Sequence, residues 1–113
     1  MKIINATKQQ VICTEISIAD TFMRRFLGLM GKKEIPPGKG LIITPCNSIH
    51  TFFMRMPLDI IFIDKNNIAL HVIENLQPWR ISPVILNARS VIEVPSGTVK
   101  KTGTTQGDRL EIV

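Results

Sequence analysis

The sequence predicts an all-β, mainly antiparallel protein with one short helix near residues 20–30. Isoleucine and other β-branched residues recur in short apolar runs, and seven Gly and seven Pro break these runs. Turn signals recur roughly every 8–12 residues, which is typical of a β-sandwich or a closed barrel. Most connections are too short for the crossovers that parallel strands need. With 113 residues, 44% hydrophobic and 20% charged, we expect a single domain over residues 1–113.

The predicted strands are short and follow one another along the whole chain. They cover residues 2–6, 11–18, 40–44, 46–54, 59–64, 68–73, 88–94 and 109–113. The segment 59–64 is apolar nearly throughout, as in a strand buried on both faces. The Asn-rich residues 65–67 are typical of a hairpin turn, so 68–73 is expected to pair with 59–64. Thr98 is suited to begin a single helical turn that ends near Gly103.

One segment has the apolar spacing of a longer helix. Asp20 is suited to be its N-cap, and Phe22, Phe26 and Met30 follow at intervals of four residues. We expect this stripe to pack into the core, because such stripes serve packing more often than binding. Gly31 suits the position just after the last helical residue.

The most informative stretch runs from residue 46 to residue 64, because it is strongly apolar and yet carries several polar groups. If its first half is extended, Cys46, Ser48 and His50 share one face of the strand. Pro57 cannot donate a hydrogen bond to a sheet, so we expect a bend or bulge there. A core strand does not need these polar side chains. A functional site is therefore expected in this stretch.

Two chemistries that Cys46 and His50 suggest are not favoured by their spacing. As a nucleophile and a base they would need direct contact, but four residues along a strand span about 13 Å. Together with His71 they also suggest metal ligands, but the close ligand spacings of zinc motifs are absent from the sequence. We expect no metal site.

Arg55 and Asp59 flank the predicted bend and allow two interpretations. One is a structural ion pair, because a buried carboxylate must be paired. In the other, Arg55 and Arg80 face a cavity and bind an anionic group of a ligand. Trp79 lies in the long connection 74–87, where it would either wall a pocket or cover one end of the core.

The charge and the remaining composition argue against several function classes. The formal net charge is +5, but the basic residues are scattered in pairs along the chain. Nucleic-acid-binding modules and glycine-rich phosphate loops are absent from the sequence, so neither a nucleic acid nor a cofactor is expected. The two Cys residues do not form a disulfide framework, and no segment has the length of a signal peptide or a membrane span. We therefore expect a cytoplasmic protein without a membrane partner.

Several motifs follow one another in the order of a known family. They are Gly28–Met30, His50–Asp64, Gln77–Arg80, Ala88–Gly97 and Gly107–Asp108. Together they span most of the chain from residue 16 onward, and they resemble the domain-of-unknown-function 192 family of small prokaryotic proteins. The resemblance implies a compact, mainly β, jelly-roll-like sandwich or barrel, and it implies no established activity. The family's signature positions are matched at His50, Met54, Arg55, Pro57, Asp59, Trp79, Arg80, Glu93 and Asp108.

We expect a binding module for a small polar or anionic ligand. The candidate ligand-binding residues are Ser48, His50, Arg55, Asp59, Trp79 and Arg80. They are expected to gather at one end of the sandwich or in the mouth of the barrel, where such sites often lie. One alternative is an enzyme that uses His50 with Cys46 or Asp59 in acid–base or nucleophilic chemistry. The other is a protein-interaction module. The sequence does not predict catalytic residues, the ligand's identity or the oligomeric state.

Overall fold

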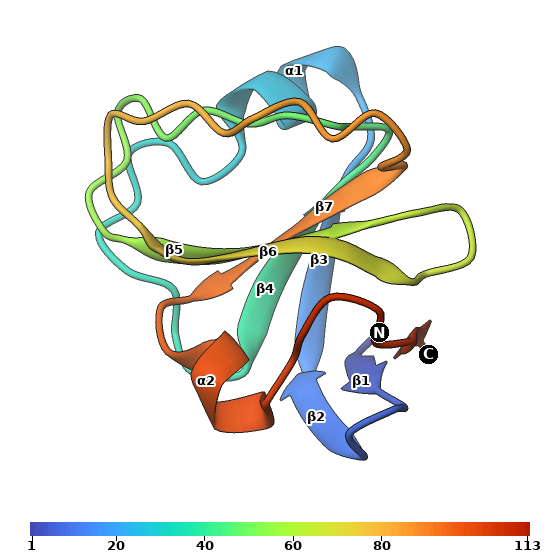
Figure 1. Cartoon of the computed structure of the whole chain (residues 1–113). Coiled ribbons are helices and arrows are strands. Elements are labelled where there is room, and N and C mark those ends of the chain that lie inside the picture. The colour runs from blue at the N-terminus through green and yellow to red at the C-terminus, as the bar shows by residue number, and fades with distance from the viewer.

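The computed structural model describes all 113 residues and contains two β-sheets and two short helices (Figure 1). The strands are β1 (Ile3–Asn5), β2 (Gln10–Cys13), β3 (Glu15–Ala19), β4 (Lys39–Ile43), β5 (Leu58–Ile63), β6 (Ala69–Leu76), β7 (Ser90–Pro95) and β8 (Leu110–Ile112). The helices are α1 (Phe22–Leu27) and α2 (Thr98–Thr102). The larger sheet has the strand order β3-β4-β7-β5-β6, and the smaller has the order β2-β1-β8.

Strand pairing confirms the predicted all-β, mainly antiparallel class. Every neighbouring pair is antiparallel except β3 and β4, which run parallel. The chain between these two strands contains α1 and is long enough for the crossover that a parallel pair requires. The predicted hairpin is also confirmed, since β5 pairs with β6 across the turn at residues 65–67. The jelly-roll-like topology stays a prediction.

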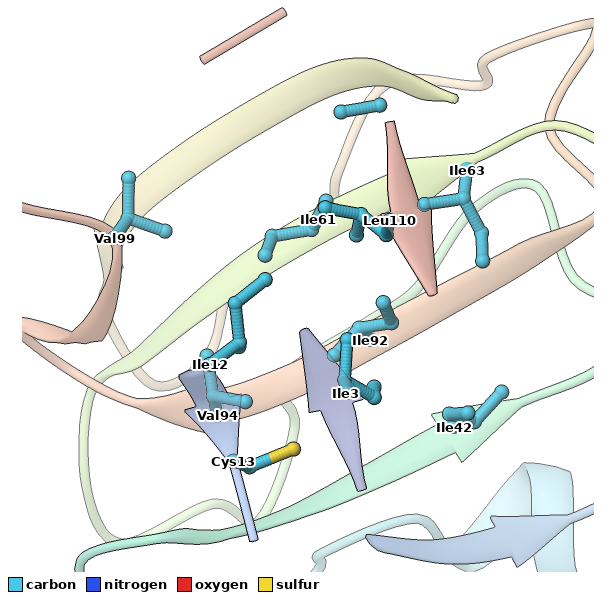
Figure 2. Close-up of a cluster of buried hydrophobic side chains, with 11 residues drawn as sticks. Ile3, Ile12, Cys13, Ile42, Ile61, Ile63, Ile92, Val94, Val99 and Leu110 are labelled. Atoms are coloured by element: carbon cyan, nitrogen blue, oxygen red, sulfur yellow. The ribbon is translucent and has the colours of Figure 1, made fainter. Parts of the chain in front are cut away.

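The two faces of the large sheet carry separate core clusters. On one face, the small sheet covers β5 and β7, so that Ile3 and Leu110 lie over side chains of the large sheet, and Val99 of α2 lies at the edge of this cluster (Figure 2). All six residues of β5 are buried, which confirms the prediction of a strand buried on both faces. Successive side chains of β7 point to opposite faces of the sheet, so Ile92 belongs to this cluster and Val91 belongs to the cluster on the other face.

The second face is covered by α1 and by two long segments without regular strands, 44–57 and 77–89. Figure 1 shows these segments, in green and orange, running across the end of the molecule opposite α2. They lie side by side, because the N–H of Thr51 donates to the carbonyl oxygen of Arg80 and the N–H of Ser82 donates to that of Ile49. The predicted strand 46–54 is therefore wrong. Its one ladder contact is an isolated bridge between His50 and Ile81.

Helix α1 is shorter than predicted. Thr21, and not Asp20, caps its first turn, because the Thr21 side chain accepts the N–H of Arg24. The helix ends at Gly28, whose φ of +48° an L-residue rarely adopts, and so does not reach Gly31. The predicted helical turn near Thr98 is confirmed as α2. Neither helix has the length and apolar character needed to cross a membrane.

The two Phe residues of the predicted stripe are not buried, contrary to the prediction, whereas Met30 is partly buried against the core cluster. Phe22 is 73% exposed and Phe26 is 54% exposed. The physical reason is that the helix lies at the rim of a cavity, so its Phe side chains face that cavity and the solvent instead of the core. Leu29, just beyond the helix, is the residue of this region that enters the core cluster.

Candidate functional site

A cavity of about 220 Å³ lies between α1, the segment 45–50 and the large sheet. The sheet contributes Ile43 of β4 and Glu93 of β7 to its lining. Phe22 and Phe26 of α1 form one wall, and Ile49 and Met54 contribute apolar surface from the other side. Its polar and ionisable lining residues are Arg25, Cys46, Ser48, His50 and Glu93. A small cavity with apolar walls and a few convergent polar groups has the composition of a ligand site.

Glu93 is the most unusual residue of this cavity. It lies in the middle of β7, the central strand of the large sheet, and it is only 1% exposed. It shares a sheet face with Val91, which belongs to the apolar cluster there. Burial raises the pKa of the Glu93 carboxyl to about 8, so this group is mostly protonated and uncharged at neutral pH.

The backbone of Gly28 closes one side of the space around this carboxyl. A Cβ atom at this position would lie 3.5 Å from Glu93 Oε1 and 4.0 Å from Met54 Cε. The positive φ of Gly28 also disfavours any side chain there. Gly28 therefore ends α1 and brings the chain close to the buried carboxyl at the same time.

Arg25 supplies a positive charge on the wall formed by α1. Its Nη1 donates to the carbonyl oxygen of Pro45 at 3.1 Å, which ties α1 to the segment opposite. Its Nε is buried and has no hydrogen-bond partner in the protein. Because a guanidinium stays charged at all relevant pH values, Arg25 can donate but never accept.

Arg25 Nε and Glu93 Oε1 are the two buried side-chain polar atoms of the chain that lack a hydrogen-bond partner. Such atoms are rare, because each unpaired one costs roughly 1–3 kcal/mol. Both residues line the same cavity, and no ion pair joins them. The residues that line this cavity thus include a donor and a carboxyl oxygen that the protein itself does not satisfy, and both atoms are covered by neighbouring groups.

Cys46 is a poor candidate for a nucleophile. Its Sγ donates to the carbonyl oxygen of Ser48 at 3.0 Å. Burial raises the pKa of the Cys46 thiol, and the neighbouring Glu93 raises it further, against the opposing effects of the Ser48 hydrogen bond and Arg25. A thiol with a raised pKa is protonated at neutral pH, and the thiolate is the reactive form.

His50 lines the cavity without a catalytic partner. Its Nδ1 accepts the N–H of Phe52 at 3.2 Å, and its ring contacts those of Phe26 and Phe52. None of its hydrogen bonds involves Cys46 or Asp59, so the pair that the enzymatic alternative requires is not formed. Because Nδ1 is an acceptor, the proton of the neutral ring lies on Nε2, which can donate to a ligand.

Two of the six residues proposed from sequence, Ser48 and His50, line the cavity. The Ser48 hydroxyl lies 3.3 Å from the carbonyl oxygen of Ser82 and 3.4 Å from its hydroxyl, so it links the segments 44–57 and 77–89. The structure brings Ser48 and His50 together with Arg25 and Glu93. It places the other four residues elsewhere.

Asp59 is fully buried in β5, and its hydrogen bonds are those of a residue that stabilises the fold. Its carboxylate accepts the backbone N–H groups of Asn75, Gly97 and Val99 at 2.8, 3.0 and 2.9 Å. Two of these donors belong to the start of α2, so Asp59 holds α2 against β5 and β6. The predicted ion pair with Arg55 is wrong, because backbone donors satisfy the carboxylate instead.

Arg55 is exposed and forms no ion pair. We expect Arg55→Ala to change the free energy of unfolding by less than ~0.5 kcal/mol, as is usual at exposed positions without special contacts. Urea denaturation of the two proteins measures this difference. A loss of several kcal/mol would contradict the placement of Arg55 in solvent.

Trp79 and Arg80 lie outside the cavity. The Trp79 ring contacts Phe52 and Phe53, with centroid distances of 5.9 and 4.8 Å, and it is 56% exposed. The Arg80 side chain is exposed, while its backbone N–H donates to Thr51 Oγ1. Trp79 is therefore not a wall of this cavity.

The six candidate ligand-binding residues include neither Arg25 nor Glu93, although Glu93 is among the positions that match the family's signature. Glu93 had a usable signal, since it is the one charged residue in the otherwise apolar run 91–94. Arg25 had a weaker signal, since it follows Phe22 by three residues and such residues are neighbours on one face of a helix.

The DUF192 family model, described as an uncharacterized ACR, matches residues 3–112. The chain belongs to this family. A UPF0127 protein of Pyrococcus horikoshii is 38% identical to this DUF192 chain over 114 residues, which cover 96% of both proteins. A UPF0127 protein of Pyrococcus furiosus is 34% identical over 113 residues, which cover 96% of this chain and 95% of that protein.

Two crystal structures resemble that of this DUF192 chain. A Novosphingobium aromaticivorans protein of unknown function has a TM-score of 0.87 at 22% identity, with 99% of this chain and 84% of that one covered. A Sinorhizobium meliloti protein, described as a proposed transcription regulator, has a TM-score of 0.80 at 27% identity, with 97% and 89% covered. The first similarity establishes the fold alone.

Proposed function

We propose that this DUF192 chain is a binding module for a small organic anion, which occupies the cavity between α1, the segment 45–50 and β7. The observation that carries the proposal is the pair of unpartnered buried groups, Arg25 Nε and the Glu93 carboxyl, in one cavity. A ligand oxyanion would accept from both, since the guanidinium is charged and the protonated carboxyl has an O–H to donate. His50 Nε2 offers a further donor on the same lining.

Burial makes Glu93 compatible with an anionic ligand. A charged carboxylate would repel the ligand, whereas a carboxyl with a pKa of about 8 is mostly neutral at pH 7. The rest of the lining is largely apolar and favours a ligand with a small hydrocarbon body. The volume of about 220 Å³ is below the roughly 300–1,000 Å³ of pockets for drug-sized ligands, which favours a molecule the size of a small carboxylic acid.

A thermal-shift screen of small mono- and dicarboxylates at pH 6 tests this proposal. A ligand at ten times its Kd is expected to stabilise the protein by about 1.4 kcal/mol, or roughly 5 °C for a domain of this size. Arg25→Gln should abolish the shift, because it removes the charged donor. Arg24→Gln is the matched control, since Arg24 is the exposed neighbour on the same helix and does not line the cavity.

The pH dependence of binding gives a second readout. Carboxylate ligands stay ionised from pH 6 to pH 9, while Glu93 loses its proton over this range, so binding to the unmodified protein should weaken as pH rises. Glu93→Gln keeps an N–H donor and should remove this weakening. If no carboxylate stabilises the protein, or if Arg25→Gln responds like Arg24→Gln, the proposal is wrong.

Two other functions receive less support from the geometry. An enzyme would need a reacting pair, and His50 contacts neither Cys46 nor Asp59 through a hydrogen bond. The Sinorhizobium meliloti relative is described as a proposed transcription regulator, but the longest helix here has six residues and no helix-turn-helix is formed.

A further inference from the structure

One end of the molecule is formed by three segments, 21–33, 44–57 and 77–89, which we call the apical surface. In Figure 1 this end contains α1 and the two long segments, opposite α2 and the small sheet. Backbone hydrogen bonds join the three segments, because Gly31 donates to Phe53, Thr51 donates to Arg80 and Ser82 donates to Ile49. Residues that are far apart in sequence therefore share one surface.

The apical surface carries most of the exposed apolar side chains of the protein. Of the 13 large hydrophobic residues that are exposed, nine lie here. They are Phe22, Met23, Phe26, Leu27, Phe53, Trp79, Ile81, Val84 and Leu86. Leu86 is 85% exposed and Ile81 is 68% exposed. Single exposed apolar residues are ordinary, but such a concentration at one end marks an interaction surface.

The apical surface also carries an excess of basic residues. Its three segments hold seven of the 14 Lys and Arg residues, and the exposed acidic residues Asp20 and Glu34 directly flank the segment 21–33. The seven basic residues are Arg24, Arg25, Lys32, Lys33, Arg55, Arg80 and Arg89, all of them exposed except Arg25. The formal charge of the three segments is +7, and it is +5 when the flanking Asp20 and Glu34 are counted with them. The fold brings basic residues of three segments to this end, although Lys32 shares a surface hollow with Glu34 and Arg89 shares one with Asp64.

We propose that the apical surface docks onto an anionic lipid bilayer, a partner that the sequence alone did not lead us to expect. Exposed aromatic and aliphatic side chains would enter the headgroup region, and the basic residues around them would attract acidic lipids. This proposal goes beyond the small-molecule site. It rests on surface residues and does not depend on Glu93.

Three observations favour a bilayer over other partners. The apolar side chains come from three separate segments, and a fluid surface can receive them without the matched shape that a protein partner needs. Nucleic acid offers phosphates but little surface to receive exposed Leu, Ile and Val side chains. A second copy of this chain would place one surface with an excess of positive charge against another.

Vesicle flotation combined with Trp fluorescence tests the proposal on the intact chain. Trp79 is the single Trp of the chain and lies on the apical surface, so its emission reports directly on insertion. We expect binding to vesicles with about one third phosphatidylglycerol, a blue shift of the Trp79 emission, and weakening as salt is added. We expect little binding to pure phosphatidylcholine vesicles.

Matched substitutions separate the contributions of charge and apolar surface. The double variant Arg24→Glu and Arg80→Glu should bind at least ~25-fold more weakly, because each basic residue contributes roughly fivefold. The control is the double variant Lys100→Glu and Lys101→Glu, whose positions are exposed on α2 at the other end of the molecule. It should bind vesicles far more tightly than the Arg24→Glu and Arg80→Glu variant. Leu86→Ser should weaken binding and reduce the blue shift, whereas Val11→Ser, exposed on β2, should do neither.

Several outcomes would overturn the proposal. These are no binding to the anionic vesicles, equal binding to neutral and anionic vesicles, or binding that leaves the Trp79 emission unchanged. Tighter binding to duplex DNA or to an acidic peptide at the same salt concentration would also overturn it. Glu93→Gln should bind vesicles like the unmodified protein, so failure here and failure of the small-molecule site are distinguishable.

Discussion

The unmodified protein is expected to become less stable as pH rises from about 5 to about 8, and replacing Glu93 with glutamine should abolish this pH dependence. Burial raises the pKa of this carboxyl from 4.5 to about 8 in the folded state, while in the unfolded chain it returns to its ordinary value. Between these values the folded state holds a proton that the unfolded state has released. The free energy of unfolding therefore falls as pH rises, by about 1.4 kcal/mol per pH unit.

Urea denaturation of the unmodified protein and of Glu93→Gln at several pH values measures this effect. The stability contributed by the protonated carboxyl is fully present below about pH 4.5 and is lost as pH rises to about 8. Relative to the unmodified protein, the variant should thus gain several kcal/mol from pH 5 to pH 9. Glu34→Gln, at an exposed position, is the control and should leave the pH profile unchanged. A constant difference between Glu93→Gln and the unmodified protein would show that Glu93 is not buried as described.

The burial of Glu93 destabilises the fold, and this cost supports its assignment to the proposed ligand-binding site. An apolar residue at this position would fill the space beside Val91 without the cost of an unpaired carboxyl. Groups held with strongly shifted pKa values concentrate at functional sites, where their cost is offset by what they bind. Glu93 is therefore the residue whose environment most needs a functional explanation.

The elements that the sequence predicts well are those whose signals are local. The β5–β6 hairpin follows from an apolar run, an Asn-rich turn and a second apolar run within 20 residues or so. The turn of α2 likewise follows from Thr98 and Gly103 at its two ends. In both cases the residues that decide the structure are near neighbours, so no tertiary contact had to be known.

The segment 46–54 shows where local reasoning ends. Its alternation suggested a strand, but a strand needs a partner, and the neighbouring segment 77–89 provides only one ladder bridge, at His50 and Ile81. Phe53 moreover adopts a φ of +65°, which is incompatible with an extended strand. Tertiary contacts with α1 and with the segment 77–89 decide this conformation.

The site could be predicted only in part for the same reason. Ser48 and His50 were placed together by alternation, and both line the cavity. Arg25 and Glu93 come from a helix and a strand far apart in sequence, so no helix or strand periodicity in the sequence could place them together. Asp59 was paired with the wrong partner, because its three backbone donors come from the end of β6 and the start of α2.

Replacing Asp59 with alanine should destabilise the protein by roughly 3–5 kcal/mol. The substitution leaves the N–H groups of Asn75, Gly97 and Val99 without their acceptor, and each buried unpaired donor costs roughly 1–3 kcal/mol before water relieves part of the loss. Such a change is a large part of the 5–15 kcal/mol that typically stabilises a domain. Asp59→Asn should cost almost as much, because its amide keeps one acceptor oxygen but presents an NH₂ group to the remaining donors.

Urea denaturation at pH 7 ranks these variants, and we expect the order of destabilisation Asp59→Ala, Asp59→Asn, Arg55→Ala. Hydrogen exchange provides a local readout if the first variant is too unstable to titrate. In Asp59→Asn the amides of Gly97 and Val99 should exchange faster than in the unmodified protein, because both lose their charged acceptor. Arg55→Ala should leave these amides unchanged, since Arg55 does not contact the carboxylate. Equal and small effects of Asp59→Ala and Arg55→Ala would mean that Asp59 does not anchor α2, and a ligand-binding role for this carboxylate would then have to be reconsidered.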